Sequence, residues 1–172
     1  MKRNAFLVVV DMQNDFIDGA LGTKEAVAIV DRVIKEVEEF GGEVIFTRDT
    51  HGENYLQTQE GRLLPVEHCV ENTDGWQLQP RLKELSEGRT VIDKPAFGSM
   101  ALPNYIKGKG APDTIVLVGL CTDICVINNA MILKAAFPEA EIFVDSAACA
   151  GTTPENHENA LRAMKQCQIL IL

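Results

Sequence analysis

The chain has 172 residues, of which 46% are hydrophobic, and this length suits one domain with one sizeable core over residues 1–172. Sixteen Lys and Arg stand against twenty-five Asp and Glu, and the formal net charge of −9 argues against nucleic acid or an anionic membrane as a partner, because both bind a basic face. No apolar run approaches the length of a bilayer span, and the five cysteines lack paired spacing, so we expect a cytoplasmic chain with free thiols.

Short apolar runs alternate with amphipathic stretches along the chain. The first run is followed by apolar side chains at a 3.6-residue period over residues 26–40, which predicts a helix that ends at Gly41 and Gly42. This alternation predicts an α/β fold with a six-stranded, mostly parallel sheet and helices on both faces. The strands are expected at residues 6–10, 43–47, 90–93, 115–118, 142–144 and 169–172.

Residues 48–79 show weak periodicity and several turn residues, so we expect a long loop there. Loops of this length in compact domains are usually functional. A largely apolar helix is expected over residues 124–137, before Pro138. Thr153 can cap a last helix that has Pro154 in its first turn.

Polar side chains stand where the predicted strands end. In open α/β sheets, chemistry gathers beyond the carboxyl ends of the strands. We therefore expect an acid, a lysine and a thiol to meet at one edge of the sheet. The strand ends deliver, in order, Asp11, Asp49, Lys94, Cys121 and Asp145.

Cys125 follows Thr122 and Asp123, either of which can cap a helix that begins here. The partial positive charge of a helix start favours the nucleophilic thiolate, and a nearby Lys94 would favour it further. Asp11 could take the thiol proton and return it to a leaving group. A buried structural cysteine, a surface lysine and a turn aspartate are the alternatives, and the shared sheet edge favours catalysis over them.

Asp49 and His51 lie two apart after the second strand, so on an extended segment their side chains point the same way, as a metal site requires. His68, from the same loop, completes a set that suits zinc, iron or manganese, although short motifs of this kind also occur without metal. Phe16, Trp76 and Phe97 are candidate walls for a flat substrate, with core packing as the alternative. His157 and Asp145 are expected to be hydrogen-bonded structural residues, His157 in the core or at an interface.

Five motifs occur in the chain in a fixed order: DMQNDF at 11–16, RDTH at 48–51, PVEHCV at 65–70, DKPAFGS at 93–99 and GLCTDICV at 119–126. In this order and at these separations they resemble the isochorismatase-like cysteine hydrolases, most closely the nicotinamidases, over nearly the whole chain. The resemblance implies a three-layer fold and a hydrolase of a linear amide C–N bond. It also implies conversion of nicotinamide to nicotinate and ammonia, through a cysteine thioester, in the salvage of NAD.

The resemblance also implies which residues act. The family's Asp–Lys–Cys triad corresponds to Asp11, Lys94 and Cys125. A cis peptide at Leu120–Cys121 would turn the backbone N–H groups of Cys121 and Cys125 into an oxyanion hole, and such donors typically lower a barrier by about 3 kcal/mol.

For the metal, the resemblance implies one divalent ion at Asp49, His51 and His68, most simply zinc, with iron or manganese as alternatives. The family often adds a histidine or glutamate from the loop, for which Glu60 is the better match and Glu53 the fallback. The ion would orient the pyridine ring through its nitrogen.

The chain departs from the family pattern after His68, where residues 72–76 read NTDGW and Trp76 replaces a small residue. The substrate could therefore be another small amide, or that of an isochorismatase-type relative. A non-enzymatic metal- or partner-binding module that retains the fold is a further alternative, which the intact triad disfavours. The expected partner is a small-molecule amide, and a homo-oligomer stays open.

Overall fold

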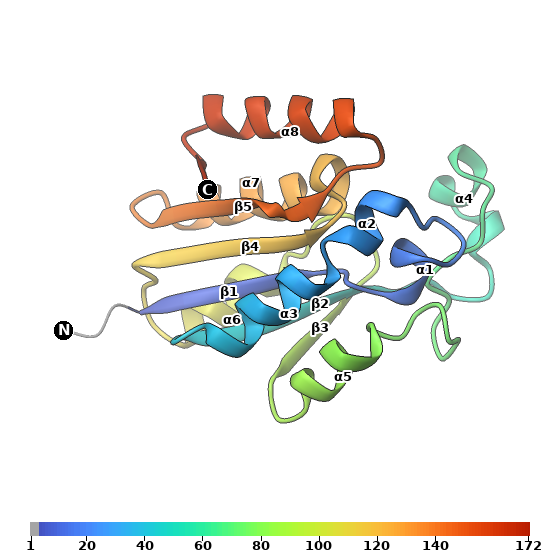
Figure 1. The fold of residues 1–172 in the computed structure, drawn as a ribbon, viewed down its shortest axis with the longest axis horizontal. Coiled ribbons are helices and arrows are strands. Elements are labelled where there is room, and N and C mark those ends of the chain that lie inside the picture. Colours follow the sequence, from blue (N-terminus) through green and yellow to red (C-terminus); the bar gives the residue numbers. More distant parts are fainter. Residues whose placement is uncertain (1–3) are drawn as a thin grey trace.

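The computed structural model describes residues 4–172. A six-stranded sheet forms the central layer of this part of the structure (Figure 1). The strand order is β3-β2-β1-β4-β5-β6, and each neighbouring pair is parallel. The prediction of a six-stranded, mostly parallel sheet is confirmed. The strands are β1 (Ala5–Val10), β2 (Glu43–Asp49), β3 (Thr90–Lys94), β4 (Thr114–Leu120), β5 (Glu141–Ala150) and β6 (Leu170–Ile171).

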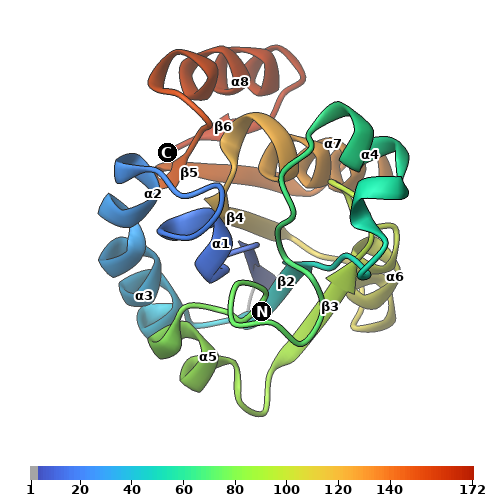
Figure 2. The same cartoon turned by 90° about the vertical axis from the view of Figure 1, so that its right-hand side faces the viewer.

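Helices connect the strands and cover both faces of the sheet (Figure 2). They are α1 (Asn14–Ile17), α2 (Lys24–Ala28), α3 (Val30–Glu39), the 3-10 turn η1 (Tyr55–Gln57), α4 (Gln59–Leu63), α5 (Pro80–Ser86), α6 (Ala101–Gly108), the π-helical turn η2 (Thr122–Val126), α7 (Ile127–Ala136) and α8 (Pro154–Gln166). Among the helices of residues 4–172, none combines the length and apolar composition that a membrane span needs.

The central strand β1 is buried on both faces, which explains its uninterrupted apolar sequence. Phe6, Val8 and Val10 pack into a core with α6, α7 and α8. Leu7 and Val9 point to the other face and pack with α1, α2, α3 and α5. Successive side chains of a strand alternate between faces, so one strand anchors both helical layers.

The predicted helix over residues 26–40 is present as two helices, α2 and α3, which meet at Ile29. The backbone of Ile29 stays in the right-handed region, at φ −89° and ψ −10°. The buried stripe therefore continues from Ala26 through Ile29 to Val33 and Val37. The spacing of the apolar residues thus correctly predicted which face of the helices is buried, but it did not predict the interruption at Ile29.

The segment 48–79, predicted as a long loop, holds η1 and α4. Thr58 caps α4, because its side chain accepts a hydrogen bond from Gly61 N at 3.0 Å. Helix α5 was not predicted, although Pro80 stands in its first turn and Gln79 caps it through Oε1. The compact segment between β2 and α5 brings several polar side chains over the sheet edge.

Candidate active site

The strands β1 and β4 end where the order of the sheet reverses, since the chain continues to β2 and β3 on one side and to β5 and β6 on the other. Ligands of such sheets bind in the crevice at this point. Gly119 in β4 has a φ of 114°, and a Cβ there would lie 2.1 Å from Val10 O. Glycine thus lets the two strand ends approach closely.

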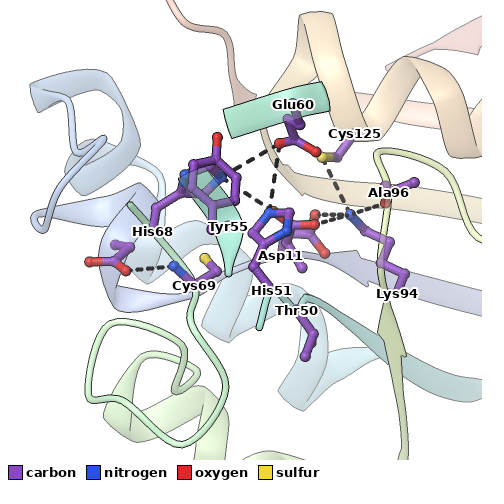
Figure 3. A network of polar contacts seen from close by, with 12 residues as sticks. Asp11, Thr50, His51, Tyr55, Glu60, His68, Cys69, Lys94, Ala96 and Cys125 are labelled. Atoms are coloured by element: carbon purple, nitrogen blue, oxygen red, sulfur yellow. Dashed lines mark hydrogen bonds and ion pairs between the residues drawn. The ribbon is translucent and has the colours of Figure 1, made fainter. Parts of the chain in front are cut away.

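Asp11, Lys94 and Cys125 meet in this crevice (Figure 3). Lys94 Nζ lies 2.6 Å from Asp11 Oδ2 and 3.4 Å from Cys125 Sγ. It also donates a hydrogen bond to Ala96 O at 3.0 Å. The three residues are 0%, 1% and 3% exposed, in that order, so their charges interact without screening by bulk water.

The two carboxylate oxygens of Asp11 have different partners. Thr47 Oγ1 donates to Oδ1 at 2.6 Å. Oδ2 pairs with the Lys94 ammonium, but its geometry gives it no hydrogen bond from any described side chain. A buried carboxylate oxygen beside a thiol is placed to accept a proton.

Burial raises the pKa of the Cys125 thiol, Asp11 raises it further, and Lys94 opposes both. Burial also raises the pKa of Asp11, against the attraction of Lys94. For Lys94, burial alone would lower the pKa, but the charge of Asp11 outweighs it and raises the pKa. The ammonium is therefore charged. The thiolate expected from the sequence is therefore opposed by burial and by the neighbouring carboxylates, and favoured by the Lys94 ammonium.

Cys125 lies in η2, a π-helical turn that leads directly into α7. Such turns are frequent at functional sites. The peptide bond between Leu120 and Cys121 is cis, as the family resemblance implied. Burial raises the pKa of the Cys121 thiol to about 12, so this second thiol is a poor nucleophile.

Four other side chains form a second group beside the triad: Asp49, His51, Glu60 and His68. One ligand atom from each lies within 4.8 Å of the others. Asp49 Oδ2 is 2.9 Å from His51 Nε2 and 3.5 Å from His68 Nε2. Glu60 Oε1 is 3.6 Å and 3.8 Å from the same two nitrogens. Of the two glutamates left open by the sequence, Glu60 is the one that joins this group.

The donor set fits a divalent ion. Among residues 4–172, no side chain or backbone group donates a hydrogen bond to the buried Asp49 Oδ1. His68 Nδ1 donates to Val66 O at 2.8 Å, which leaves the lone pair on Nε2 facing the carboxylates. Burial alone would raise the pKa of Asp49, but the neighbouring His51, His68 and Lys94 side chains hold it well below its usual range. The carboxylate is thus ionised, as metal binding requires.

A cavity of about 350 Å³ joins the two groups. Asp49, Glu60 and His68 line one part of it, and Cys121 and Cys125 line another. Apolar side chains form much of the remaining wall, among them Phe16, Leu21, Leu63, Leu64, Phe97 and Ile124. A pocket with apolar walls and a few convergent polar groups is typical of a small-molecule site.

Trp76 lies outside the lining of this cavity, in contrast to the sequence-based prediction. Its Nε1 donates to Thr50 Oγ1 at 2.9 Å, and the Arg48 guanidinium lies 3.7 Å from the ring centroid. The indole therefore supports the segment that follows β2. Asp145 pairs with Arg32 at 2.8 Å and is also outside the lining, as expected of a structural residue.

Four residues that the sequence analysis did not single out position the site: Gln13, Thr47, Tyr55 and Asn129. Gln13 Nε2 donates to Asp49 O at 2.8 Å, which ties the end of β1 to the end of β2. Asn129 Nδ2 donates to Cys125 O at 2.8 Å, and its Oδ1 accepts from Ser99 N at 2.9 Å. The ring of Tyr55 lies 4.7 Å and 4.9 Å from those of the two metal-group histidines.

The arrangement defines a class: a thiol with an acid and a lysine at the carboxyl edge of a parallel sheet can support nucleophilic hydrolysis. Residues 5–172 match the isochorismatase domain family, and the chain belongs to this family.

Individual relatives agree with this assignment. The crystal structure of a pyrazinamidase of Pyrococcus horikoshii in complex with zinc is 31% identical, with a TM-score of 0.86 and coverage of 98% of both chains. A curated nicotinamidase of Acinetobacter baylyi is 28% identical over 83% of this chain and 80% of its own length. A probable inactive nicotinamidase of Arabidopsis thaliana is 28% identical over 95% of this chain and 89% of its own. The relatives thus establish the family, whereas the specific activity of this chain has to be inferred from the residues of its site.

Proposed function

We propose that this chain is a nicotinamidase, an amidohydrolase that converts nicotinamide to nicotinate and ammonia through a thioester on Cys125. The coarser statement, that it is a hydrolase of amide C–N bonds, follows from its nicotinamidase relatives. The observation that carries the proposal is that one cavity is lined both by Cys125, which contacts Lys94 of the triad, and by three members of the candidate metal group, Asp49, Glu60 and His68. A non-catalytic module would need neither the acid nor the lysine beside the thiol.

In the first half of the reaction, Asp11 Oδ2 takes the proton of Cys125 Sγ while the sulfur attacks the amide carbon. The C–S bond forms, and the backbone N–H groups of Cys121 and Cys125 hold the oxyanion. When the oxyanion collapses, the C–N bond breaks and Asp11 returns its proton to the nitrogen, so ammonia leaves. Cys125 then carries the acyl group as a thioester.

In the second half, Asp11 takes a proton from water while the water oxygen attacks the thioester carbon. The C–S bond breaks, Asp11 returns its proton to Cys125 Sγ, and the carboxylic acid product releases its own proton to solvent to become nicotinate. Lys94 is charged in the resting enzyme, because the negative charge of Asp11 raises its pKa and Asp49 acts in the same direction. Its ammonium favours the thiolate during attack and keeps the buried carboxylate in place.

Asp49, His51, Glu60 and His68 would hold one divalent ion, most simply zinc, with iron or manganese as alternatives. When bound, the ion would supply a Lewis acid for the ring nitrogen of the substrate. Phe16 and Phe97, which line the cavity, would pack against the flat ring. A cytoplasmic role in recycling the pyridine part of NAD belongs to the same proposal.

The direct test is ammonia release from a panel of small amides. Nicotinamide and pyrazinamide, which carry the ring nitrogen, should be hydrolysed, while benzamide, which lacks it, should be a much poorer substrate. Equal turnover of benzamide and nicotinamide would contradict the ring-binding role. If other small amides alone were hydrolysed, the chain would be a cysteine hydrolase of a different substrate.

A further inference from the structure

The start of α8 lies against the turn that carries Cys125, although about thirty residues of chain separate them. Figure 1 shows α8 packed above β5 and α7, with its N-terminal end beside the turn that precedes α7. His157 Nδ1 and Thr122 Oγ1 are hydrogen-bonded at 2.8 Å. The Asp123 carboxylate accepts hydrogen bonds from Thr152 N at 2.8 Å and from Thr152 Oγ1 at 2.5 Å. Thr122 and Asp123 are thus both anchored by hydrogen bonds, the first to α8 and the second to the segment just before it.

The contact from His157 is the more buried of the two. Thr122 is 0% exposed, so its hydroxyl cannot turn to bulk water. A buried hydroxyl that loses its partner is costly, and the surrounding backbone shifts to relieve it. The sequence analysis expected a hydrogen-bonded structural histidine here, and this hydrogen bond confirms that part of the expectation. This hydrogen bond, however, connects His157 to η2, the turn that carries Cys125.

The position of the His157 imidazole along α8 is itself fixed by a close contact. Gly151, at the end of β5, approaches so closely that a Cβ there would lie 2.7 Å from His157 N. The end of the strand therefore sets where the first turn of α8 begins, and with it the position of His157.

We propose that His157 is a positioning residue for the reaction: through Thr122 it holds η2 so that Cys125 Sγ stays in reach of Asp11 and Lys94. The inference rests on the proposed function and adds a residue outside the cavity to it. Reacting groups displaced by about 1 Å can lose a hundredfold in rate, so a turn that carries the nucleophile needs such an anchor. Asn129 holds the same turn from its C-terminal side, by bonding Cys125 O at 2.8 Å.

The test compares four variants: His157→Leu, His157→Asn, Thr122→Val and the double variant His157→Leu/Thr122→Val. Loss of the hydrogen bond in either single variant should lower kcat about tenfold, with KM for nicotinamide within about twofold of the wild type. The double variant should be no worse than either single one, since both remove the same interaction. His157→Asn should recover most of kcat, because its amide can still bond to Thr122.

A second readout needs no substrate and separates this inference from the proposed function. Iodoacetamide labels each cysteine, and the exposed Cys167 serves as the reference thiol in the same chain. In His157→Leu and Thr122→Val, the pH profile of labelling at Cys125 should move toward that of Cys167, because the thiol leaves Asp11 and Lys94. Wild-type protein that hydrolyses no pyridine amide would refute the proposed function, and the labelling comparison would still decide the role of His157.

Thr153→Ala is the matched control, since it removes the cap of α8 without touching η2. It should lower the melting temperature and leave the labelling profile and kcat unchanged. The inference is overturned if His157→Leu and Thr122→Val behave like Thr153→Ala, with a lower melting temperature alone. If His157→Leu fails to fold, the near-isosteric Thr122→Val decides by the same criteria.

Discussion

Replacing Lys94 with Met should destabilise the protein strongly, because it removes one partner of a buried ion pair. The side chain of Lys94 is 0% exposed and its ammonium lies 2.6 Å from Asp11 and 3.5 Å from Asp49. Removing a buried partner and leaving the opposite charge unpaired costs about 3–5 kcal/mol, out of a total stability of about 5–15 kcal/mol. For a chain of this size, each kcal/mol lowers Tm by roughly 2–4 °C, so Tm should fall by roughly 6–20 °C.

The destabilisation should depend on pH in a defined direction. Burial already raises the pKa of Asp11, and without Lys94 that pKa rises further. A carboxyl whose folded pKa is raised binds its proton more readily in the folded state, so the stability of Lys94→Met increases as pH falls toward the ordinary pKa of aspartate. The pKa of Lys94 is itself raised, so its own stabilising contribution is constant below the ordinary pKa of lysine. The difference in stability between wild type and variant should therefore narrow as pH falls from neutral toward the ordinary pKa of aspartate.

The assay is thermal unfolding by circular dichroism across this pH range, with Lys109→Met as the matched control. Lys109 pairs with Glu43 at 3.2 Å but is 47% exposed, so its loss should destabilise the protein far less than the loss of Lys94. Alkylation of Cys125 in the same Lys94→Met sample should require a higher pH than in the wild type, because Lys94 opposes the rise in the thiol pKa. Equal Tm values for the two variants, or an unchanged alkylation profile, would refute the role given to Lys94.

Three further predictions concern the metal group and the second thiol. Elemental analysis should find about one divalent ion per chain, lost in Asp49→Ala; protein that stays metal-free after incubation with zinc, iron and manganese would argue against the site. Glu60→Ala should weaken retention of the ion against a chelator while Glu53→Ala should not, and the reverse order would exchange their roles. Cys121→Ala should keep most of kcat, since only its backbone N–H is assigned a part; a loss as large as in Cys125→Ala would give its thiol a role.

The edge of the sheet at which the site lies could be predicted from the sequence, because buried parallel strands are recognisable as continuous apolar runs. The apolar run of β1 ends with the strand just before Asp11, and that of β2 ends shortly before Asp49, the last residue of the strand; a parallel sheet then brings those ends together. The place of Glu60 came from the family resemblance and not from periodicity. Its position is set by α4, whose cap at Thr58 is a local signal that the sequence analysis did not use.

What could not be predicted depends on contacts between distant segments. Trp76 was expected at the pocket, but its indole contacts Arg48 and Thr50 and lies outside the cavity lining. Asn129 stands out as a polar residue in an apolar helix, yet its partner on the loop after β3 is visible only in the fold. The deep burial of Cys125 could not be predicted either, because the sequence gives its position near a helix start but not how far it lies from solvent.

The most direct test of the central claim is a rapid-quench experiment that looks for the acyl group on Cys125. Protein mixed with excess nicotinamide is quenched in acid, digested and examined by mass spectrometry. We predict a nicotinoyl group on the peptide that carries Cys125, formed together with ammonia, and no such adduct or turnover in a folded Cys125→Ala variant. Ammonia release without an adduct at any time point, combined with turnover in Cys125→Ala, would contradict the thioester mechanism.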